Sequence, residues 1–187
     1  MAIARLDRRP GERFLEVGVG TGWAFARVVG ASGAGGAFGV DVAAGMLAVA
    51  RRRLRDEAGL AQAPLLLADA RALPFPDAAF DCLLSSYTLE VLSRRDMALV
   101  LAECRRVLRP SGRVVLLNLT EGEGEDAAIT DDWKRRFAAD AEAFGGARPV
   151  RLAPLLEELG FREVRRRYVG GKWPSELLSA ARPAAVP

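Results

Sequence analysis

The chain has 187 residues, of which 50% are hydrophobic, and it carries 27 Lys and Arg against 24 Asp and Glu. This length suits one well-packed domain and is short for two, and the composition is typical of a globular protein rather than a disordered one. Because the chain has neither an unbroken run of 18 apolar residues nor an apolar leader, we expect no membrane span and a cytoplasmic location. The net charge of +3 is modest, and a compositional bias toward Arg explains it before a polyanion site does.

The chain contains no histidine. Histidine is the commonest general base and a frequent zinc ligand, so its absence argues against Ser-His-Asp hydrolases and against most zinc sites. We therefore predict no metal site. The two cysteines, Cys82 and Cys104, lack C-x-x-C spacing and are expected to be reduced residues of the core.

After a short basic lead that ends in a turn at Pro10-Gly11, the stretch FLEVGVGTG at 14–22 predicts a buried strand and a glycine loop. The glycines at alternate positions, Gly18, Gly20 and Gly22, allow positive φ and close approach of a ligand to the backbone. A helix is expected from 23 to 29, with its free N–H groups facing the loop. This arrangement predicts a nucleotide-type site, although a tight turn also explains the glycines.

Two details of this stretch favour one class of ligand. The glycine spacing is G-x-G-x-G, whereas dinucleotide-binding enzymes have G-x-G-x-x-G. In addition, Glu16 lies at the end of the strand, where it would repel a pyrophosphate and attract a cation. Both details favour a positively charged nucleoside such as S-adenosyl-L-methionine over NAD.

The next elements alternate between strand and helix. After a loop at 30–36, a second strand at 37–40 ends on Asp41, which lies 23 residues beyond Gly18. A carboxylate near this interval meets ribose hydroxyls in nucleotide-binding folds, and the alternative is that Asp41 caps the helix at 44–55. Further strands are predicted at 65–68, 82–86 and 113–118, with a helix at 96–108. This alternation predicts a doubly wound, mostly parallel sheet with ligands at its carboxyl edge.

The last third of the chain begins with an acidic segment at 121–142, which we predict to be a solvated loop and a short helix. Trp133 and Phe137 either line an acceptor pocket or, as we favour, pack the apolar side of a surface helix. A helix at 154–159 and antiparallel strands at 163–169 and 175–180 complete the chain. The arginines at 165–167 are explained equally well by protection of an edge strand and by an anionic partner.

Four motifs in order resemble those of class I S-adenosylmethionine-dependent methyltransferases, of the group that includes the ubiquinone and menaquinone C-methyltransferases. They are LEVGVGTG, then Gly39-Val40-Asp41 with Met46-Leu47, then Asp69-Ala70 before LPFPDAAFD, and finally ECRRVLRPSGRVV. The resemblance implies a Rossmann-like α/β fold with seven strands and an antiparallel C-terminal strand. It implies a single domain over 1–187, with a core at 10–120, an acceptor-side insertion at about 119–150, and a terminal helix and strand pair at 151–182.

The resemblance also implies a role for individual residues in binding S-adenosyl-L-methionine. Glu16, Gly18, Gly20 and Gly22 are expected at the methionine end, Asp41 at the ribose, Met46 and Asp69 at the adenine together with the Ala70 N–H, and Ser85 and Ser86 beside the sulfonium. For Met46 a place in the core is the alternative, and for the two serines it is a turn at the end of the strand. Tyr87 and Glu90 are the candidates for a catalytic role, and the catalytic residue is otherwise unassigned.

The function implied is methyl transfer from S-adenosyl-L-methionine to a small-molecule acceptor, and a non-catalytic cofactor-binding subunit is the alternative. A nucleic-acid acceptor is not expected, since the aromatic-proline motif of amino-group methylases is missing after the fourth strand. The chain departs from its relatives in two ways. It has Glu90-Val91 where they commonly have a histidine pair, and its first strand starts near Arg13 without several dozen preceding helical residues. The second departure leads us to expect a homodimer that covers the exposed sheet face.

Overall fold

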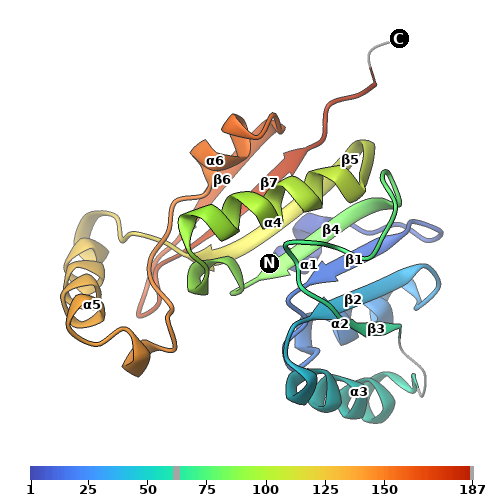
Figure 1. The fold of residues 1–187 in the computed structure, drawn as a ribbon, viewed down its shortest axis with the longest axis horizontal. Helices are drawn as coiled ribbons and strands as arrows, with labels where there is room; N and C mark the ends of the chain where they lie inside the picture. Colours follow the sequence, from blue (N-terminus) through green and yellow to red (C-terminus); the bar gives the residue numbers. More distant parts are fainter. Residues whose placement is uncertain (61–63, 186–187) are drawn as a thin grey trace.

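The computed structural model describes residues 1–60 and 64–185. One seven-stranded sheet with the order β3-β2-β1-β4-β5-β7-β6 forms the centre of the molecule (Figure 1). Its strands are β1 (Phe14–Val17), β2 (Ala37–Asp41), β3 (Leu65–Leu67), β4 (Phe80–Ser86), β5 (Leu108–Leu119), β6 (Arg162–Val169) and β7 (Ser175–Ala181). The helices are α1 (Ala2–Leu6), α2 (Trp23–Ser32), α3 (Ala44–Ala58), α4 (Arg94–Val107), α5 (Ala127–Ala139) and α6 (Ala153–Glu158), with single 3-10 turns η1 (Leu89–Val91), η2 (Gly124–Asp126) and η3 (Glu142–Phe144).

The sheet confirms the predicted doubly wound fold. The strands from β3 across to β5 are parallel, and β7 is inserted antiparallel between β5 and β6. From β1 the chain builds outward to β2 and β3, and then returns to the other side of β1 with β4 and β5. The strand order therefore reverses between β1 and β4, and ligands of such folds bind at the carboxyl ends of strands at this point.

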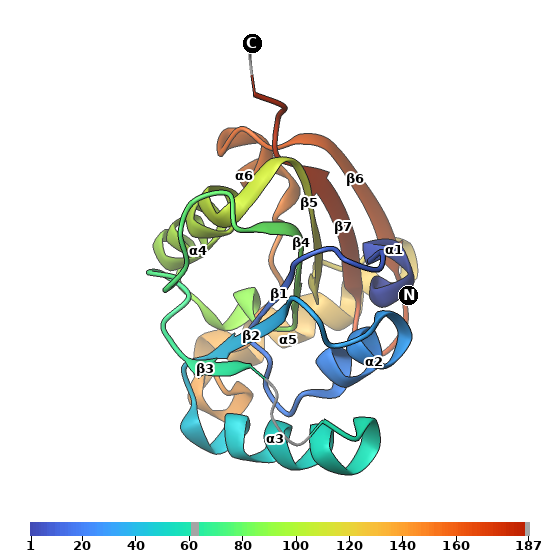
Figure 2. The same ribbon diagram turned by 90° about the vertical axis from the view of Figure 1, so that its right-hand side faces the viewer.

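Two apolar cores lie on opposite faces of the sheet. Figure 2 shows α4 and α6 on one face and α1 and α2 on the other. Because successive side chains of a strand point to opposite faces, Phe14 joins the core under α1, α2 and α3, while Leu15 and Val17 join the core under α4 and α6. The strand β1 is buried along its whole length, as its apolar run predicts. No helix in the described residues combines the length and apolar character that a bilayer span requires.

The structure corrects several predicted boundaries. The basic lead contains a helix, α1, which buries Ala2 and Leu6 against the sheet. Helix α2 continues to Ser32, so the first part of the expected loop at 30–36 is helical. Strand β5 begins at Leu108, which was the last residue of the expected helix at 96–108, and so it starts five residues before the expected strand at 113–118. These differences arise from long-range pairing and burial, which local sequence patterns do not report.

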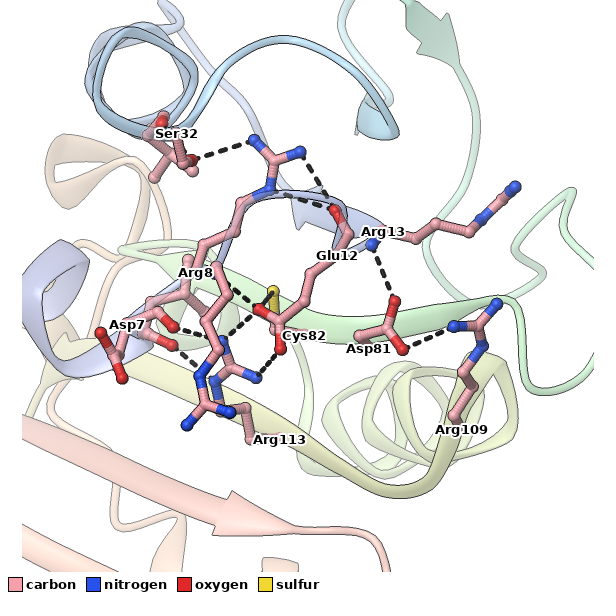
Figure 3. Close-up of polar contacts among 12 residues, drawn as sticks. Asp7, Arg8, Glu12, Arg13, Ser32, Asp81, Cys82, Arg109 and Arg113 are labelled. Atoms are coloured by element: carbon pink, nitrogen blue, oxygen red, sulfur yellow. Dashed lines mark hydrogen bonds and ion pairs between the residues drawn. The ribbon is translucent and has the colours of Figure 1, made fainter.

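Ion pairs at the amino edge of the sheet account for several of the arginines (Figure 3). Arg113 on β5 pairs with both carboxylate oxygens of Glu12 at 2.8 and 2.6 Å, and it donates to the Leu6 carbonyl at 2.6 Å. Asp81 on β4 accepts from the Arg13 backbone N–H at 2.8 Å and pairs with Arg109 at 2.6 Å. Arg113 therefore ties α1 to β5, while Asp81 ties β4 to the segment before β1. The Arg content thus serves structure at these positions.

Candidate functional site

A cavity of about 850 Å³ lies at the carboxyl ends of β1, β2, β3 and β4. Its walls come from the glycine loop after β1, the end of β2, the segment after β3 and the segment after β4. The candidate residues that it brings together are Glu16, Gly18, Gly20, Asp41, Met46, Asp69, Ala70, Ser86 and Tyr87. Gly22, Ser85 and Glu90 lie outside this lining.

All three glycines of the loop have positive φ, but the space around them differs. A Cβ on Gly18 would overlap the Thr88 side chain, and a Cβ on Gly22 would lie 2.9 Å from the Ala50 Cβ, so packing requires glycine at both positions. A Cβ on Gly20 would meet nothing within 4 Å, although its φ of +54° disfavours other residues. Gly20 therefore leaves open space beside the backbone in the cavity wall, whereas Gly22 lets α2 approach α3.

Asp41 joins the end of β2 to the glycine loop. Its Oδ2 accepts from the Gly20 N–H at 2.7 Å, and its Oδ1 accepts from the Ala43 N–H at 2.9 Å. The alternative that Asp41 caps the following helix is wrong, because α3 has Ala43 at its N-cap and no side-chain capping bond. Each carboxylate oxygen retains a further acceptor position, so Asp41 is able to accept from a ligand.

Glu16 is the most deeply buried charged side chain of the cavity lining, with 1% of its surface exposed. Its Oε2 makes no hydrogen bond within the described residues. Burial raises the pKa of Glu16 well above its ordinary value, and the nearby charge of Asp41 raises this pKa further. A buried carboxyl group with an unpartnered oxygen beside a second acid is a natural partner for a ligand cation.

Asp69 and Met46, which are predicted to contact the adenine, also line the cavity. The Asp69 carboxylate accepts from the Arg71 backbone N–H at 2.9 Å and pairs with the Arg71 guanidinium at 2.7 Å, which lowers the pKa of Asp69. Met46 is 46% exposed, so the alternative that places it in the core is wrong. Met46 lines the cavity, and an exposed thioether there is available to pack against a planar ligand.

The two predicted serines, Ser85 and Ser86, are the last residues of β4 and point to different surroundings. Ser86 lines the cavity, whereas the Ser85 hydroxyl is buried and donates to the Val17 carbonyl at 2.9 Å. The next residue, Tyr87, has a φ of +50°, and its hydroxyl lies 3.2 Å from the Ser175 hydroxyl. A left-handed backbone at a non-glycine residue is strained, and strain of this kind clusters at functional sites.

Glu90 lies behind this segment and not in the cavity wall. Its Oε1 accepts from the Leu119 N–H at 3.4 Å, while its Oε2 has no partner within the described residues. Burial raises the pKa of Glu90 to about 7. The side chain therefore points toward β5, which makes direct contact with a substrate in the cavity unavailable to it in this conformation.

Sequence reasoning missed several cavity-lining residues, notably Trp23, Val42, Thr88 and Val91. Three of them are large apolar side chains that stay exposed, with Trp23 at 53% and Val42 at 74%. For Trp23 and Val42 the available signal was a position directly after the glycine loop and directly after Asp41. Trp133 and Phe137, which were candidates for an acceptor pocket, do not line this cavity. Trp133 instead packs edge-to-face on Trp173 at 5.1 Å, as the favoured alternative predicts.

Comparison with known proteins agrees with this geometry. The profile of a family described as a methyltransferase domain matches residues 14–112. The ubiquinone/menaquinone biosynthesis C-methyltransferase UbiE of Burkholderia mallei is 39% identical over 188 residues, which cover 90% of this chain and 75% of that one. Among solved structures, an S-adenosylmethionine-dependent methyltransferase of Methanosarcina mazei has a TM-score of 0.77 at 18% identity, over 98% of this chain and 97% of that one.

A second similar structure is the phosphoethanolamine N-methyltransferase 2 of Haemonchus contortus in complex with S-adenosyl-L-methionine. Its TM-score is 0.77 at 17% identity, over 97% of this chain and 51% of that one. The chain belongs to the class I S-adenosylmethionine-dependent methyltransferases. Its activity is methyl transfer, and its cofactor is S-adenosyl-L-methionine. The alternative of a non-catalytic subunit is not favoured.

Proposed function

We propose that the cavity at the carboxyl edge binds S-adenosyl-L-methionine and presents its methyl group to a small, largely apolar acceptor. The observation that carries this proposal is the charge of the lining. Glu16, Asp41 and Asp69 face the cavity, and the only cation among its described lining residues, Arg71, is paired with Asp69. An excess of carboxylates favours a cationic nucleoside and disfavours a pyrophosphate.

Each acidic residue has a distinct proposed role. Glu16, with its unpartnered Oε2, would accept from the ammonium group of the methionine moiety. Asp41, already positioned by two backbone N–H groups, would accept from the ribose hydroxyls. Asp69 would accept from the adenine amino group, which would share that carboxylate with Arg71.

The remaining contacts position the ligand and exclude water. Gly20 would leave room for the methionine moiety, and Met46 would cover the adenine ring. The bound cofactor supplies an electrophilic methyl group on a sulfonium, which is a good leaving group. The residues of the chain therefore contribute mainly binding and orientation of the two reactants.

The acceptor is proposed to be a small molecule with an apolar ring or chain. The cavity mouth carries the exposed side chains of Trp23, Tyr87 and Val91, which form a surface suited to such a molecule. The relatives are named for C-methylation in ubiquinone or menaquinone biosynthesis. A ring precursor of that class is therefore the first acceptor to test.

Calorimetry on the whole chain tests the proposed cofactor site. We expect binding of S-adenosyl-L-methionine and of its demethylated product, and no comparable binding of NAD. Glu16→Gln keeps the shape of the side chain and removes its charge, so affinity for the cofactor should fall about tenfold. Asp132→Asn on α5, far from the lining, is the matched control. Unchanged affinity in Glu16→Gln would refute the role of Glu16, and tight binding of NAD would refute the assignment of the cavity.

We still propose a homodimer, but with a different contact surface from the bare sheet face that the sequence led us to expect. The sheet face that was expected to be bare is partly covered by α1, which buries Leu6. Exposed apolar side chains outside the cavity lining remain for a second copy, among them Leu67 on the edge strand β3, which is 61% exposed, and Val49 on α3, which is 38% exposed. Sedimentation across a wide range of concentration, run beside a turnover assay, tests the dimer. A fully active monomer at high concentration would exclude it.

A further inference from the structure

A second concave site lies on the opposite side of the sheet from α4, between α1 and the edge strand β6. This groove has a volume of about 540 Å³, and it shares no lining residue with the cofactor cavity. Figure 2 shows α1 beside the outer strands β7 and β6. Its polar lining residues are Arg5 from α1, the three arginines Arg165, Arg166 and Arg167 from β6, and Ser179 from β7.

The register of β6 explains why two of its three consecutive arginines point into the groove. Arg165 pairs with Ser179 and Arg167 pairs with Leu177, so both face the side of the sheet that carries α1. The intervening Arg166 faces the other side, where it forms ion pairs with Glu176 at 2.6 Å and with Glu123 at 2.5 Å. The short helix α1 packs on β4, β5 and β7, and Arg165 and Arg167 on β6 are exposed.

The groove is basic, and no carboxylate of its described lining neutralises its arginines. Arg165 and Arg167 have no carboxylate partner within the described residues, and Arg5 donates only to the Ser179 hydroxyl, at 3.0 and 2.8 Å. No Asp or Glu belongs to the described lining. The adjoining hollow shares Arg5, Arg165 and Ser179 with this groove, and its four arginines lie among three acids, Asp7, Glu12 and Glu163. The end of the groove that holds Arg167 is therefore the part without a nearby carboxylate in the described lining.

Protection of an edge strand explains exposed charge on β6, but it does not explain this convergence. It requires neither an arginine from α1 nor a concave site around a shared hydroxyl. Three guanidinium groups that face one small volume repel one another, and an anion between them would remove that repulsion. Guanidinium groups also match the oxygens of phosphate in geometry, with two parallel hydrogen bonds from each group.

We propose that this groove is a binding site for a phosphate group, held by Arg5, Arg165 and Arg167. The phosphate has two chemical sources, a soluble phosphate ester and the headgroup of an anionic lipid. The groove is separate from the proposed methyl-transfer site, so its occupancy and the binding of S-adenosyl-L-methionine are independently measurable.

The test uses two probes on the whole chain at low ionic strength. Inorganic pyrophosphate, followed by calorimetry, represents the soluble source. Sedimentation with vesicles of phosphatidylglycerol, compared with vesicles of phosphatidylcholine, represents the lipid source. The test variant is Arg165→Gln with Arg167→Gln. The control is Arg52→Gln with Arg162→Gln, which removes the same net charge from exposed positions outside both hollows.

We expect at least one probe to bind the wild type, with binding about tenfold weaker in the test variant and retained in the control. Loss of pyrophosphate binding supports a soluble phosphate ligand, and loss of phosphatidylglycerol binding alone supports a lipid headgroup. Absence of binding to both probes, or equal weakening in the control, would overturn the proposal. Because S-adenosyl-L-methionine affinity is measured on the same samples, misfolding of the variant is detected separately.

Discussion

Asp41 accepts a hydrogen bond from the Gly20 N–H at 2.7 Å, and this contact joins the end of β2 to the loop that follows β1. The second oxygen of the same carboxylate accepts from the Ala43 N–H at 2.9 Å. Two backbone donors thus hold the carboxylate in one orientation before any ligand arrives. A preorganised acceptor loses little conformational entropy on binding, which increases affinity.

The first prediction concerns this carboxylate. Asp41→Ala should weaken binding of S-adenosyl-L-methionine by about 2–3 kcal/mol, because it removes charge-assisted hydrogen bonds and releases the loop. Asp41→Asn keeps one acceptor oxygen, so its loss should be smaller. Calorimetry on both variants provides the measurement. Wild-type affinity in Asp41→Ala would show that Asp41 only braces the loop.

The second prediction separates strain from steric exclusion at Gly20. Gly20→Val should abolish cofactor binding while the fold survives, since the new side chain would occupy open space in the cavity wall. Gly59→Val is the matched control. Gly59 has a φ of +65°, close to +54° at Gly20, and a Cβ there also meets nothing within 4 Å. Both variants should lower the melting temperature by a similar amount. Loss of cofactor binding in both would assign the effect to strain instead.

The third prediction concerns Glu90, whose pKa burial raises to about 7 from an ordinary value of 4.5. The folded state holds this proton more tightly than the unfolded state does. The stabilisation is therefore complete below pH 4.5, decreases as pH rises, and is lost above pH 7, with a total change of about 3 kcal/mol. Glu90→Gln cannot ionise, so its unfolding free energy relative to wild type should increase between pH 5 and pH 8.

Chemical denaturation of the two proteins at several pH values measures this difference. A constant difference across that range would show that Glu90 titrates normally. The same variant reports on catalysis. If Glu90 acts only through the structure, turnover by Glu90→Gln at pH 6 should match that of the wild type.

The fourth prediction distinguishes the two adjacent serines. Ser85→Ala should cost about 1 kcal/mol of unfolding free energy, because it removes the buried bond to the Val17 carbonyl, and should leave cofactor affinity unchanged. Ser86→Ala should do the reverse, since Ser86 lines the cavity. Thermal melts and calorimetry on the same preparations provide both values. A loss of affinity confined to Ser85→Ala would contradict this assignment.

Much of the fold was predictable because its signals are local. Parallel strands buried on both faces appear as short apolar runs, and this located β1, β2 and β4. A run of three leucines located β3, although Leu67 is exposed at the edge of the sheet. Of the candidate site, the glycine loop and the acids at strand ends were also found, because the carboxyl ends of parallel strands meet at one edge. Helix α1 was missed, since its five residues carry no periodicity and Leu6 is stabilised only by distant parts of the sheet.

The sequence by itself determined the fold class and located the polar residues at the carboxyl ends of the strands. Through Glu16 and the glycine spacing it also determined the chemical class of the cofactor. Only the tertiary structure decided which of two neighbouring residues makes a structural contact and which one lines a binding surface. Ser85 and Ser86, like Arg166 and Arg167, are identical residues one position apart that face opposite sides of the sheet. The physical reason is that side chains alternate along a strand, so a single step of register separates a structural contact from a binding surface.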